Sequence, residues 1–302
     1  MVRTWDTYEK NPGVLKLSPI NKASSTERKN VAGFILIYNK FMLQFYKYHG
    51  AGNDFIIIDN RDESFDINNT ENIKLLCHRR FGVGADGVIL LKDNPDYDFE
   101  MVFANSDGSI GAMCGNGGRC VVHFAHHVLR IIKDPKNVCF LAADGEHIVE
   151  IKGDEVKLKM QNVGQIGFRN NLTFLRSGTT PHNVMFVGNL AEFPVVEQGR
   201  KIRNSDPDGV NVNFVQVKNA KNNIFYVRTY ERGVEDETLA CGTGATSVAI
   251  ASHYLGKLKE NICHIKMPGG DLTVEFEKMD DGSYRNVWLT GPAKFVFKGQ
   301  MM

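Results

Sequence analysis

Two cysteines stand in nearly identical contexts, and they are the residues of this sequence best suited to chemistry. Cys114 begins the segment Cys-Gly-Asn-Gly, and Cys241 begins the segment Cys-Gly-Thr-Gly. An apolar helix is predicted after each segment, running to about Arg130 in the first case and to about Tyr254 in the second. A cysteine at the first turn of a helix lies beside backbone N–H groups that lack helical acceptors, and these groups favour the thiolate. We therefore expect two thiols that ionise readily.

The backbone after each cysteine is suited to holding a carboxylate. Glycine allows the main chain to approach a ligand closely, and N–H groups at a helix N-terminus bind anions. These N–H groups belong to Gly115, Asn116, Gly242 and Thr243. If both helix ends face one cleft, one thiolate can remove the α-proton of an amino acid while the other thiol protonates the opposite face. Backbone dipoles would then stabilise the enediolate in place of a pyridoxal electron sink.

The spacing between the two cysteines recurs elsewhere in the chain and indicates an internal repeat. Asn53 and Thr180 each precede a predicted strand, at an offset equal to the cysteine spacing. Asn105 and Glu231 each follow a predicted strand, at nearly the same offset. A glycine turn and a further strand come after each helix. The sequence therefore predicts a mixed α/β protein of two homologous halves, with a boundary near residues 161–170.

The first half shows the expected alternation of strands and helices, and the segment before it does not. Predicted elements are strands at residues 55–59, 88–91 and 99–103 and a capped helix at residues 70–80. Residues 1–41 are polar and irregular, so we expect a poorly structured extension, with Met42 as a candidate natural start.

Composition restricts the class of protein. The chain has 302 residues, of which 42% are hydrophobic, enough for one large domain or two ordinary ones. Its net charge is +1 and it has no long run of Lys or Arg, which argues against nucleic-acid and membrane partners. The apolar stretch at residues 31–38 is too short to span a bilayer. We expect a cytoplasmic protein that acts on a small molecule.

The remaining cysteines and a histidine cluster have structural interpretations. No Cys-x-x-Cys pair occurs, which argues against a disulfide framework or a zinc site. The cysteines that we interpret as small buried residues are Cys77, Cys120, Cys139 and Cys263. His123, His126 and His127 have a metal-like spacing without a companion acidic motif, so we expect a packed or solvated helix face rather than a metal site.

With these motifs the sequence resembles the diaminopimelate epimerase family, over about residues 42–298. The motifs are residues 49–55 (HGAGNDF), 82–87 (GVGADG), 105–109 (NSDGS), 113–120 (MCGNGGRC), 181–182 (PH), 209–214 (GVNVNF), 230–233 (YERG) and 237–244 (ETLACGTG). The resemblance implies two pseudo-symmetric halves, each a sheet wrapped around a central helix. The N-terminal half would span residues 42–165, the C-terminal half residues 166–288, and a final strand at residues 289–302 would return to the first half.

The resemblance also implies an activity and a set of site residues. The activity is conversion of LL-diaminopimelate to meso-diaminopimelate for lysine and peptidoglycan precursor synthesis, with Cys114 and Cys241 as the catalytic pair and no metal or pyridoxal phosphate. The implied substrate contacts are Asn53, Asn105, Asn211, Glu231 and Arg232, with the backbone at Gly115, Asn116, Gly242 and Thr243. His182 matches a histidine near the thiols. Adjacent Glu231 and Arg232 would supply the charges that a distal amino-acid centre needs.

Two departures from the family pattern affect the expected substrate contacts, and a dimer is also implied. Thr180 stands where many members have Asn, and Gly87 stands where some have Gln. Either change affects substrate preference more than reaction type. A homodimer is expected, because Phe297 matches an aromatic position near the family's dimer contact.

Two other functions compete with this interpretation. One is a proline or hydroxyproline racemase-like enzyme, which also uses paired cysteines but has no distal charged centre to bind, so the Glu231 and Arg232 pair argues against it. The other is a non-catalytic, redox-sensitive thiol protein, which would react with thiol reagents without turning over an amino acid.

Overall fold

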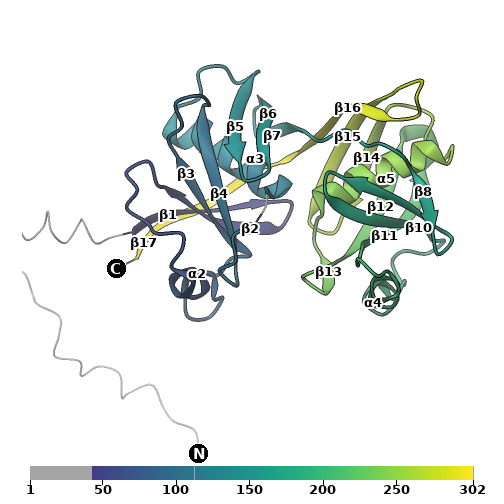
Figure 1. Ribbon diagram of the computed structural model, residues 1–302, viewed down its shortest axis with the longest axis horizontal. Coiled ribbons are helices and arrows are strands. Elements are labelled where there is room, and N and C mark those ends of the chain that lie inside the picture. Colours follow the sequence, from purple (N-terminus) through teal and green to yellow (C-terminus); the bar gives the residue numbers. More distant parts are fainter. Residues whose placement is uncertain (1–42, 112, 302) are drawn as a thin grey trace, which may run out of the picture. The chain divides into compact units, whose positions relative to one another are not determined.

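The computed structural model describes residues 43–111 and 113–301 (Figure 1). Residues 44–300 form one compact unit, and the contacts below lie within it. The predicted extension, residues 1–41, lies outside the described residues. None of the helices in the described part of the chain is long and apolar enough to cross a bilayer.

The N-terminal half contains seven strands around one long central helix. Its elements are β1 (Leu43–Gly50), β2 (Asn53–Asp59), α2 (Thr70–Cys77), β3 (Gly87–Lys92), β4 (Phe99–Asn105), α3 (Gly115–Phe124), the π-helical turn η2 (Ala125–Leu129), β5 (Val138–Ala142), β6 (Gly145–Lys152) and β7 (Glu155–Lys159). The predicted strands at residues 55–59, 88–91 and 99–103 are confirmed as parts of β2, β3 and β4.

The C-terminal half repeats this arrangement with added short elements. Its elements are β8 (Gly167–Arg169), β9 (Leu172–Ser177), β10 (Thr180–Phe186), α4 (Val195–Ser205), β11 (Asn211–Asn219), the 3-10 turn η3 (Ala220–Asn222), β12 (Ile224–Glu231), β13 (Asp236–Thr238), α5 (Gly242–Tyr254), β14 (Ile262–Met267), β15 (Gly270–Lys278), β16 (Tyr284–Pro292) and β17 (Lys294–Met301).

Strand pairing follows the same order in both halves. From β1 to β7, neighbouring strands pair antiparallel, parallel, antiparallel, parallel, antiparallel and antiparallel. The same sequence of pairings runs through β9, β10, β11, β12, β14, β15 and β16. This identical order confirms the predicted pair of homologous α/β halves.

Each half is built around its central helix, α3 or α5 (Figure 1). Every residue of α3 from Asn116 to Phe124 is buried, and its apolar side chains pack against side chains from β1 to β7. Helix α5 is buried in the same way against the strands of the second half. A helix that is enclosed on all sides is mostly apolar or small all round, and the buried polar residues of α3 are Asn116, Arg119 and His123. Their N-termini are thereby fixed in the interior.

Two strand pairings tie the end of the chain to the first half. Strand β16 pairs antiparallel with β7, with Trp288 opposite Lys159. The Trp288 ring also lies under the ammonium group of Lys157, at 5.1 Å from the ring centroid. Strand β17 then pairs with β1. One continuous order of hydrogen-bonded strands therefore runs through both halves.

Two predicted helices end differently from the prediction. The helix predicted at residues 70–80 ends at Cys77, because the next residue, His78, has an extended backbone. Gly82 packs on the last turn, where a Cβ would lie 1.8 Å from the Leu75 carbonyl oxygen. The helix predicted to run to Arg130 is α-helical only to Phe124 and continues as the π-helical turn η2. The helix predicted to reach Tyr254 does so.

Candidate active site

The two cysteines occupy the same position in the two halves, as the N-cap residue of the central helix. Cys114 directly precedes α3 and Cys241 directly precedes α5, both with an extended backbone. Their carbonyl oxygens accept the first helical hydrogen bonds, from the Gly118 N–H at 2.7 Å and from the Ala245 N–H at 2.9 Å. Neither side chain caps its helix, so both thiols are left for other contacts.

The starts of the two helices contact each other. In the first turn of α3, Asn116 Nδ2 donates to the carbonyl oxygen of Ala240 at 3.2 Å, and Ala240 directly precedes Cys241. Cys241 is 6% exposed and Cys114 is partly buried. The structure therefore brings the two predicted cysteines to one site that is mostly closed to solvent.

Burial controls the ionisation of both thiols. It is the main cause of the raised pKa of Cys114 and of Cys241, and the negative charge of Glu231 adds to it. N–H groups at the helix N-termini lower both pKa values, as expected, but they are outweighed. The prediction that these thiols ionise readily is wrong for this closed state, because it considered the helix ends without the loss of hydration.

Glu231, the last residue of β12, lies beside Cys241. Burial raises the pKa of the Glu231 carboxyl, and hydrogen bonds from the Thr238 hydroxyl and the Cys241 thiol only partly oppose this. The Thr243 hydroxyl is 3.5 Å from Cys241 Sγ. Sequence reasoning assigned Glu231 to a distal charged centre, whereas the structure places it at the thiol. There it can exchange a proton with Cys241 or pair with an ammonium group.

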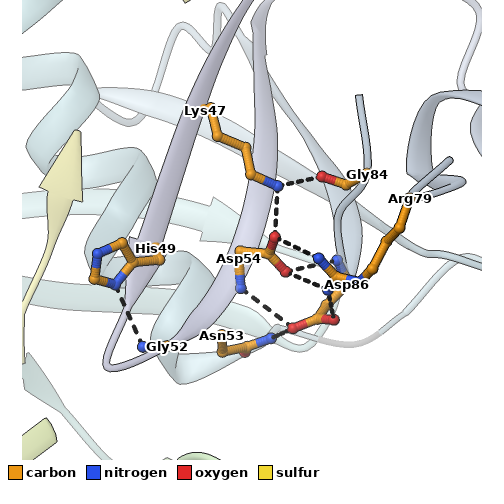
Figure 2. A network of polar contacts seen from close by, with 8 residues as sticks. All are labelled: Lys47, His49, Gly52, Asn53, Asp54, Arg79, Gly84 and Asp86. Atoms are coloured by element: carbon orange, nitrogen blue, oxygen red, sulfur yellow. Dashed lines mark hydrogen bonds and ion pairs between the residues drawn. The ribbon is translucent and has the colours of Figure 1, made fainter. Parts of the chain in front are cut away.

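Asn53, the first residue of β2, faces Cys114. Its Oδ1 atom is 3.5 Å from Cys114 Sγ and accepts from Asn116 Nδ2 at 3.1 Å. Its Nδ2 atom donates to Asp86 at 2.7 Å (Figure 2). Both the nitrogen and the oxygen of the Asn53 amide therefore make hydrogen bonds.

Arg119 is a site residue that the sequence reasoning missed. It is fully buried in α3, and its guanidinium donates to Asn116 Oδ1 at 2.7 Å and to the Gly115 carbonyl oxygen at 3.2 Å. Its charge lowers the pKa of Cys114, although burial has a larger and opposite effect. The signal was an arginine inside the otherwise small and apolar segment after Cys114. A buried cation there compensates for negative charge formed at the helix start.

His182 is a buried neutral imidazole behind Cys241. Asn213 Nδ2 donates to His182 Nδ1 at 3.1 Å, and Asn213 Oδ1 accepts from the Thr229 hydroxyl at 3.0 Å, which fixes the amide orientation. The proton of His182 therefore lies on Nε2, which has no partner among the described residues. Burial lowers the pKa of His182 to about 3. A Cβ at Gly244 would lie 2.5 Å from Asn213 Oδ1 and 3.3 Å from Cys241 Sγ, so this pair adjoins the thiol.

Asn211 and Arg232 lie together at the edge of the C-terminal half. Asn211 Oδ1 accepts the Arg232 N–H at 2.8 Å. The exposed Arg232 guanidinium donates to the carbonyl oxygen of Asp208 at 2.9 Å. Burial lowers the pKa of His182, and the charge of Arg232 adds to this effect.

Asn105, Thr180 and Gly87 make less direct contributions. Asn105, at the end of β4, donates from Nδ2 to the hydroxyl of Ser109 at 3.1 Å, within its own loop. Thr180 begins β10 as Asn53 begins β2. A Cβ at Gly87 would lie 2.5 Å from the Phe103 ring and from the Ala104 carbonyl oxygen, so this position has no space for a side chain.

The two helix ends present N–H groups for an anion, and no metal site is formed around them. No described hydrogen bond uses the N–H groups of Gly115, Gly242 or Thr243. Within residues 43–111 and 113–301, no group of three or more His, Cys, Asp or Glu is arranged to hold a metal ion. The rings of His123 and His127 lie 4.2 Å apart, centroid to centroid, with their planes tilted by 37°.

Solved structures define the class of fold. A phenazine biosynthesis protein of the PhzF family from Bacillus anthracis matches with a TM-score of 0.68 at 14% identity, over 86% of this chain and 99% of that one. A probable proline racemase from Agrobacterium radiobacter matches with a TM-score of 0.63 at 16% identity, over 86% and 93%. At such low identity these structures show the fold alone, which is that of PhzF proteins and proline racemases.

Sequence comparison gives the family. The family described as diaminopimelate epimerase matches residues 45–166 and 174–296, one segment in each half. Diaminopimelate epimerase of Flavobacterium psychrophilum is 48% identical over 260 residues, covering 85% of this chain and 99% of the relative. The enzyme of Chlorobaculum tepidum is 40% identical over 261 residues, covering 83% and 98%. The chain belongs to the diaminopimelate epimerase family.

The raised pKa values predict how the thiols react. In the unliganded protein, alkylation of Cys114 and Cys241 should have pH midpoints above that of a free cysteine, which is about 8.5. Replacing Glu231 by Gln removes a negative charge that raises both thiol pKa values, so both midpoints should fall. Peptide mass spectrometry after iodoacetamide pulses at a series of pH values measures each thiol separately. Exposed Glu192→Gln is the matched control, and unchanged midpoints in Glu231→Gln would contradict the assignment.

Proposed function

We propose that this protein is a diaminopimelate epimerase that interconverts LL- and meso-diaminopimelate with Cys114 and Cys241 as acid and base, without metal or pyridoxal phosphate. The observation that carries the proposal is the contact between the starts of α3 and α5, which places one thiol at each of two facing helix N-termini. A carboxylate bound there receives N–H groups from both helices. The α-carbon attached to it then lies between the two thiols.

The reaction needs one thiolate and one thiol at the start. In one direction, the thiolate of Cys241 takes the α-proton, and the α-carbon electrons move into the bound carboxylate to form an enediolate. The thiol of Cys114 then gives its proton to the opposite face of the carbon. The two cysteines exchange their roles in the reverse direction. N–H groups already directed at the carboxylate stabilise the developing charge without reorganisation.

Substrate binding supplies the charge that ionises a thiol. In the closed site both thiol pKa values are raised by burial. An α-ammonium group held near Glu231 places a positive charge beside Cys241, and an opposite charge lowers a thiol pKa. The Cys241 thiol lowers the pKa of the neighbouring Glu231 carboxyl, so we assign Glu231 as the group that can accept the Cys241 proton. The site therefore becomes a strong base only when substrate fills it.

The other site residues have proposed roles in binding. The neutral His182 can donate one hydrogen bond from Nε2 without adding charge. Asn105, Asn211 and the Arg232 guanidinium are assigned to the distal end of the substrate, whose carboxylate suits the planar guanidinium. A proline racemase needs no such distal contacts, and this difference favours diaminopimelate over a cyclic imino acid. We place the activity in the cytoplasm, in lysine and peptidoglycan precursor synthesis.

A turnover assay tests the proposed function. Purified protein with reductant and no added cofactor is incubated with LL-diaminopimelate, and the products are separated by chiral chromatography. We expect conversion to a mixture of LL and meso forms. L-proline is run in parallel as the competing substrate. Racemisation of proline without conversion of diaminopimelate would favour the racemase alternative, and turnover of neither would favour a non-catalytic thiol protein.

Each thiol should be required for turnover. Replacing Cys114 or Cys241 by Ser removes a group that can form a thiolate, since a serine hydroxyl is a far weaker acid. We expect kcat to fall by about a thousandfold or more in either variant, with circular dichroism unchanged. Cys263→Ser is the matched control, because Cys263 is a buried cysteine in β14 and precedes neither central helix. Near-normal turnover in either of the first two variants would disprove the two-thiol mechanism.

We also propose that the protein is a homodimer that pairs through β17. Phe295, Val296 and Phe297 are consecutive on this strand, and their exposed fractions are 46%, 52% and 45%. Strand β17 pairs with β1. An exposed apolar strand is a surface that proteins normally cover, and a second copy of the same strand can cover it.

Light scattering after size-exclusion chromatography measures the oligomeric state. We expect a dimer for the full chain, and a monomer for Phe297→Lys, because the ammonium group would be buried at the interface. Phe168→Lys is the control, since Phe168 is also exposed but lies on β8. The same measurement without residues 1–41 tests whether that segment covers β17 instead. A full chain that is monomeric would contradict the proposed dimer.

A further inference from the structure

We infer that Asp86, held by Arg79, is a positioning residue that fixes the direction of the Asn53 amide, so that the amide oxygen faces Cys114. The inference rests on the proposed function only in that Cys114 is one of its two reacting thiols. Asp86 itself makes no described contact with either cysteine. It acts through Asn53, and its effect is to hold the proton on Cys114.

The Asn53 side chain has one acceptor at one end and two donors at the other. Its Nδ2 atom donates to Asp86 Oδ2 at 2.7 Å. Its Oδ1 atom accepts from Asn116 Nδ2 at 3.1 Å and faces the Cys114 thiol at 3.5 Å. An ionised carboxylate can only accept, so it selects the amide nitrogen. The oxygen is left for Cys114.

Asp86 is fixed by a compact group of charges (Figure 2). Arg79 Nη2 donates to Asp86 Oδ1 at 2.7 Å and to Asp54 Oδ1 at 2.7 Å, while Arg79 Nη1 donates to Asp54 Oδ2 at 3.0 Å. The two aspartates also exchange hydrogen bonds between backbone N–H and carboxylate, at 3.2 Å each. Although Asp86 is an exposed residue, these contacts leave its carboxylate little freedom.

The charges in this group balance. Lys47, which is 8% exposed, donates to Asp54 at 2.6 Å and also to the Gly84 carbonyl oxygen. Burial opposes ionisation of Asp54, but hydrogen bonds from Arg79 and Lys47 outweigh it and lower the pKa of Asp54 to about 2. The group thus contains two carboxylates and two cations, so its formal charges cancel. The carboxylate of Asp86 is the acceptor that this group presents to Asn53.

Among the described residues, the C-terminal half has no carboxylate at the position that corresponds to Asp86. Phe55 lies opposite Gly87 in β2 and β3, and His182 lies opposite Asn211 in the equivalent strands β10 and β11. The residue before Gly87 is Asp86, whereas the residue before Asn211 is Val210, which is apolar and fully buried. The pseudo-symmetry is therefore broken at this position. Two thiols that must begin in opposite protonation states need such a difference.

The direction of the amide affects the pKa of Cys114. An oxygen that accepts from the thiol stabilises the protonated form and raises the pKa, whereas an N–H group pointing at sulfur would stabilise the thiolate and lower it. Other charged or titratable groups also face this region. They are Glu231 on β12, Cys241 at α5, Arg119 and Cys120 on α3, and Asp144, which accepts the N–H of Met113. The test must separate the effect of the Asn53 amide on the Cys114 pKa from the effects of these charges.

Residue-specific alkylation of the unliganded protein provides the test. In Asp86→Asn the amide of Asn53 loses its fixed acceptor and can rotate, so that its N–H group points at Cys114. The alkylation midpoint of Cys114 should therefore fall by about half a pH unit or more. The midpoint of Cys241 should move much less. Exposed Asp96→Asn is the matched control for loss of one carboxylate. An unchanged Cys114 midpoint in Asp86→Asn would overturn the inference.

A double-mutant cycle separates positioning from charge. In an Asn53→Ala background, Asp86→Asn should cause no further shift, because the amide through which Asp86 acts is gone. A shift of the same size in that background would mean that Asp86 acts by its charge, and would overturn the inference. If Asp86→Asn does not fold, Arg79→Lys carries the test, since it keeps the charge but loses the planar pair of donors. We expect a smaller fall in the Cys114 midpoint there, and an unchanged midpoint would overturn the inference.

The readout needs no substrate, so the inference and the proposed function can fail separately. Epimerisation of diaminopimelate with an unshifted Cys114 midpoint in Asp86→Asn would retain the function and overturn the positioning role. A shifted Cys114 midpoint in Asp86→Asn, in a protein that does not epimerise diaminopimelate, would retain the positioning role and overturn the proposed function.

Discussion

The structure depends on the contact between two buried helix N-termini. The hydrogen bond from Asn116 to the Ala240 carbonyl oxygen joins the first turn of α3 to the residue before Cys241. Each sheet encloses its helix, and the β7 and β16 pairing joins the two sheets into one hydrogen-bonded series. Arg119 fixes Asn116 from the interior.

Burying these helix ends has two opposite electrostatic effects. Loss of hydration raises the pKa of both thiols, while the N–H groups and Arg119 stabilise negative charge nearby. Burial is the larger effect while the site is closed and unliganded. In the mechanism that we propose, a bound amino acid changes the balance, because its ammonium group brings a positive charge to the thiols and its carboxylate occupies the N–H groups. The same burial therefore limits reactivity before substrate binds and strengthens electrostatic stabilisation afterwards.

Local pattern and repetition were enough to predict much of the fold. The repeated segments at Cys114 and Cys241 predicted the two halves, the two central helices and the N-terminal position of each cysteine, because glycine-rich helix starts leave a clear local signal. Long-range packing left no such signal. The position of Glu231 beside a thiol, the buried Arg119 and the link from Asp86 to Asn53 all depend on residues far apart in the sequence. The net pKa of each thiol depends on burial, which only the folded chain defines.

The most direct test of the two-thiol account is the distribution of deuterium during the first turnovers in D2O. Starting from LL-diaminopimelate, the account predicts that the meso product carries deuterium at the inverted α-carbon while the recovered LL substrate stays unlabelled. The reason is that the thiol that removes the proton is not the one that delivers the deuteron. Recovered substrate that gains deuterium as fast as the product would mean that one group performs both steps, and would contradict the account.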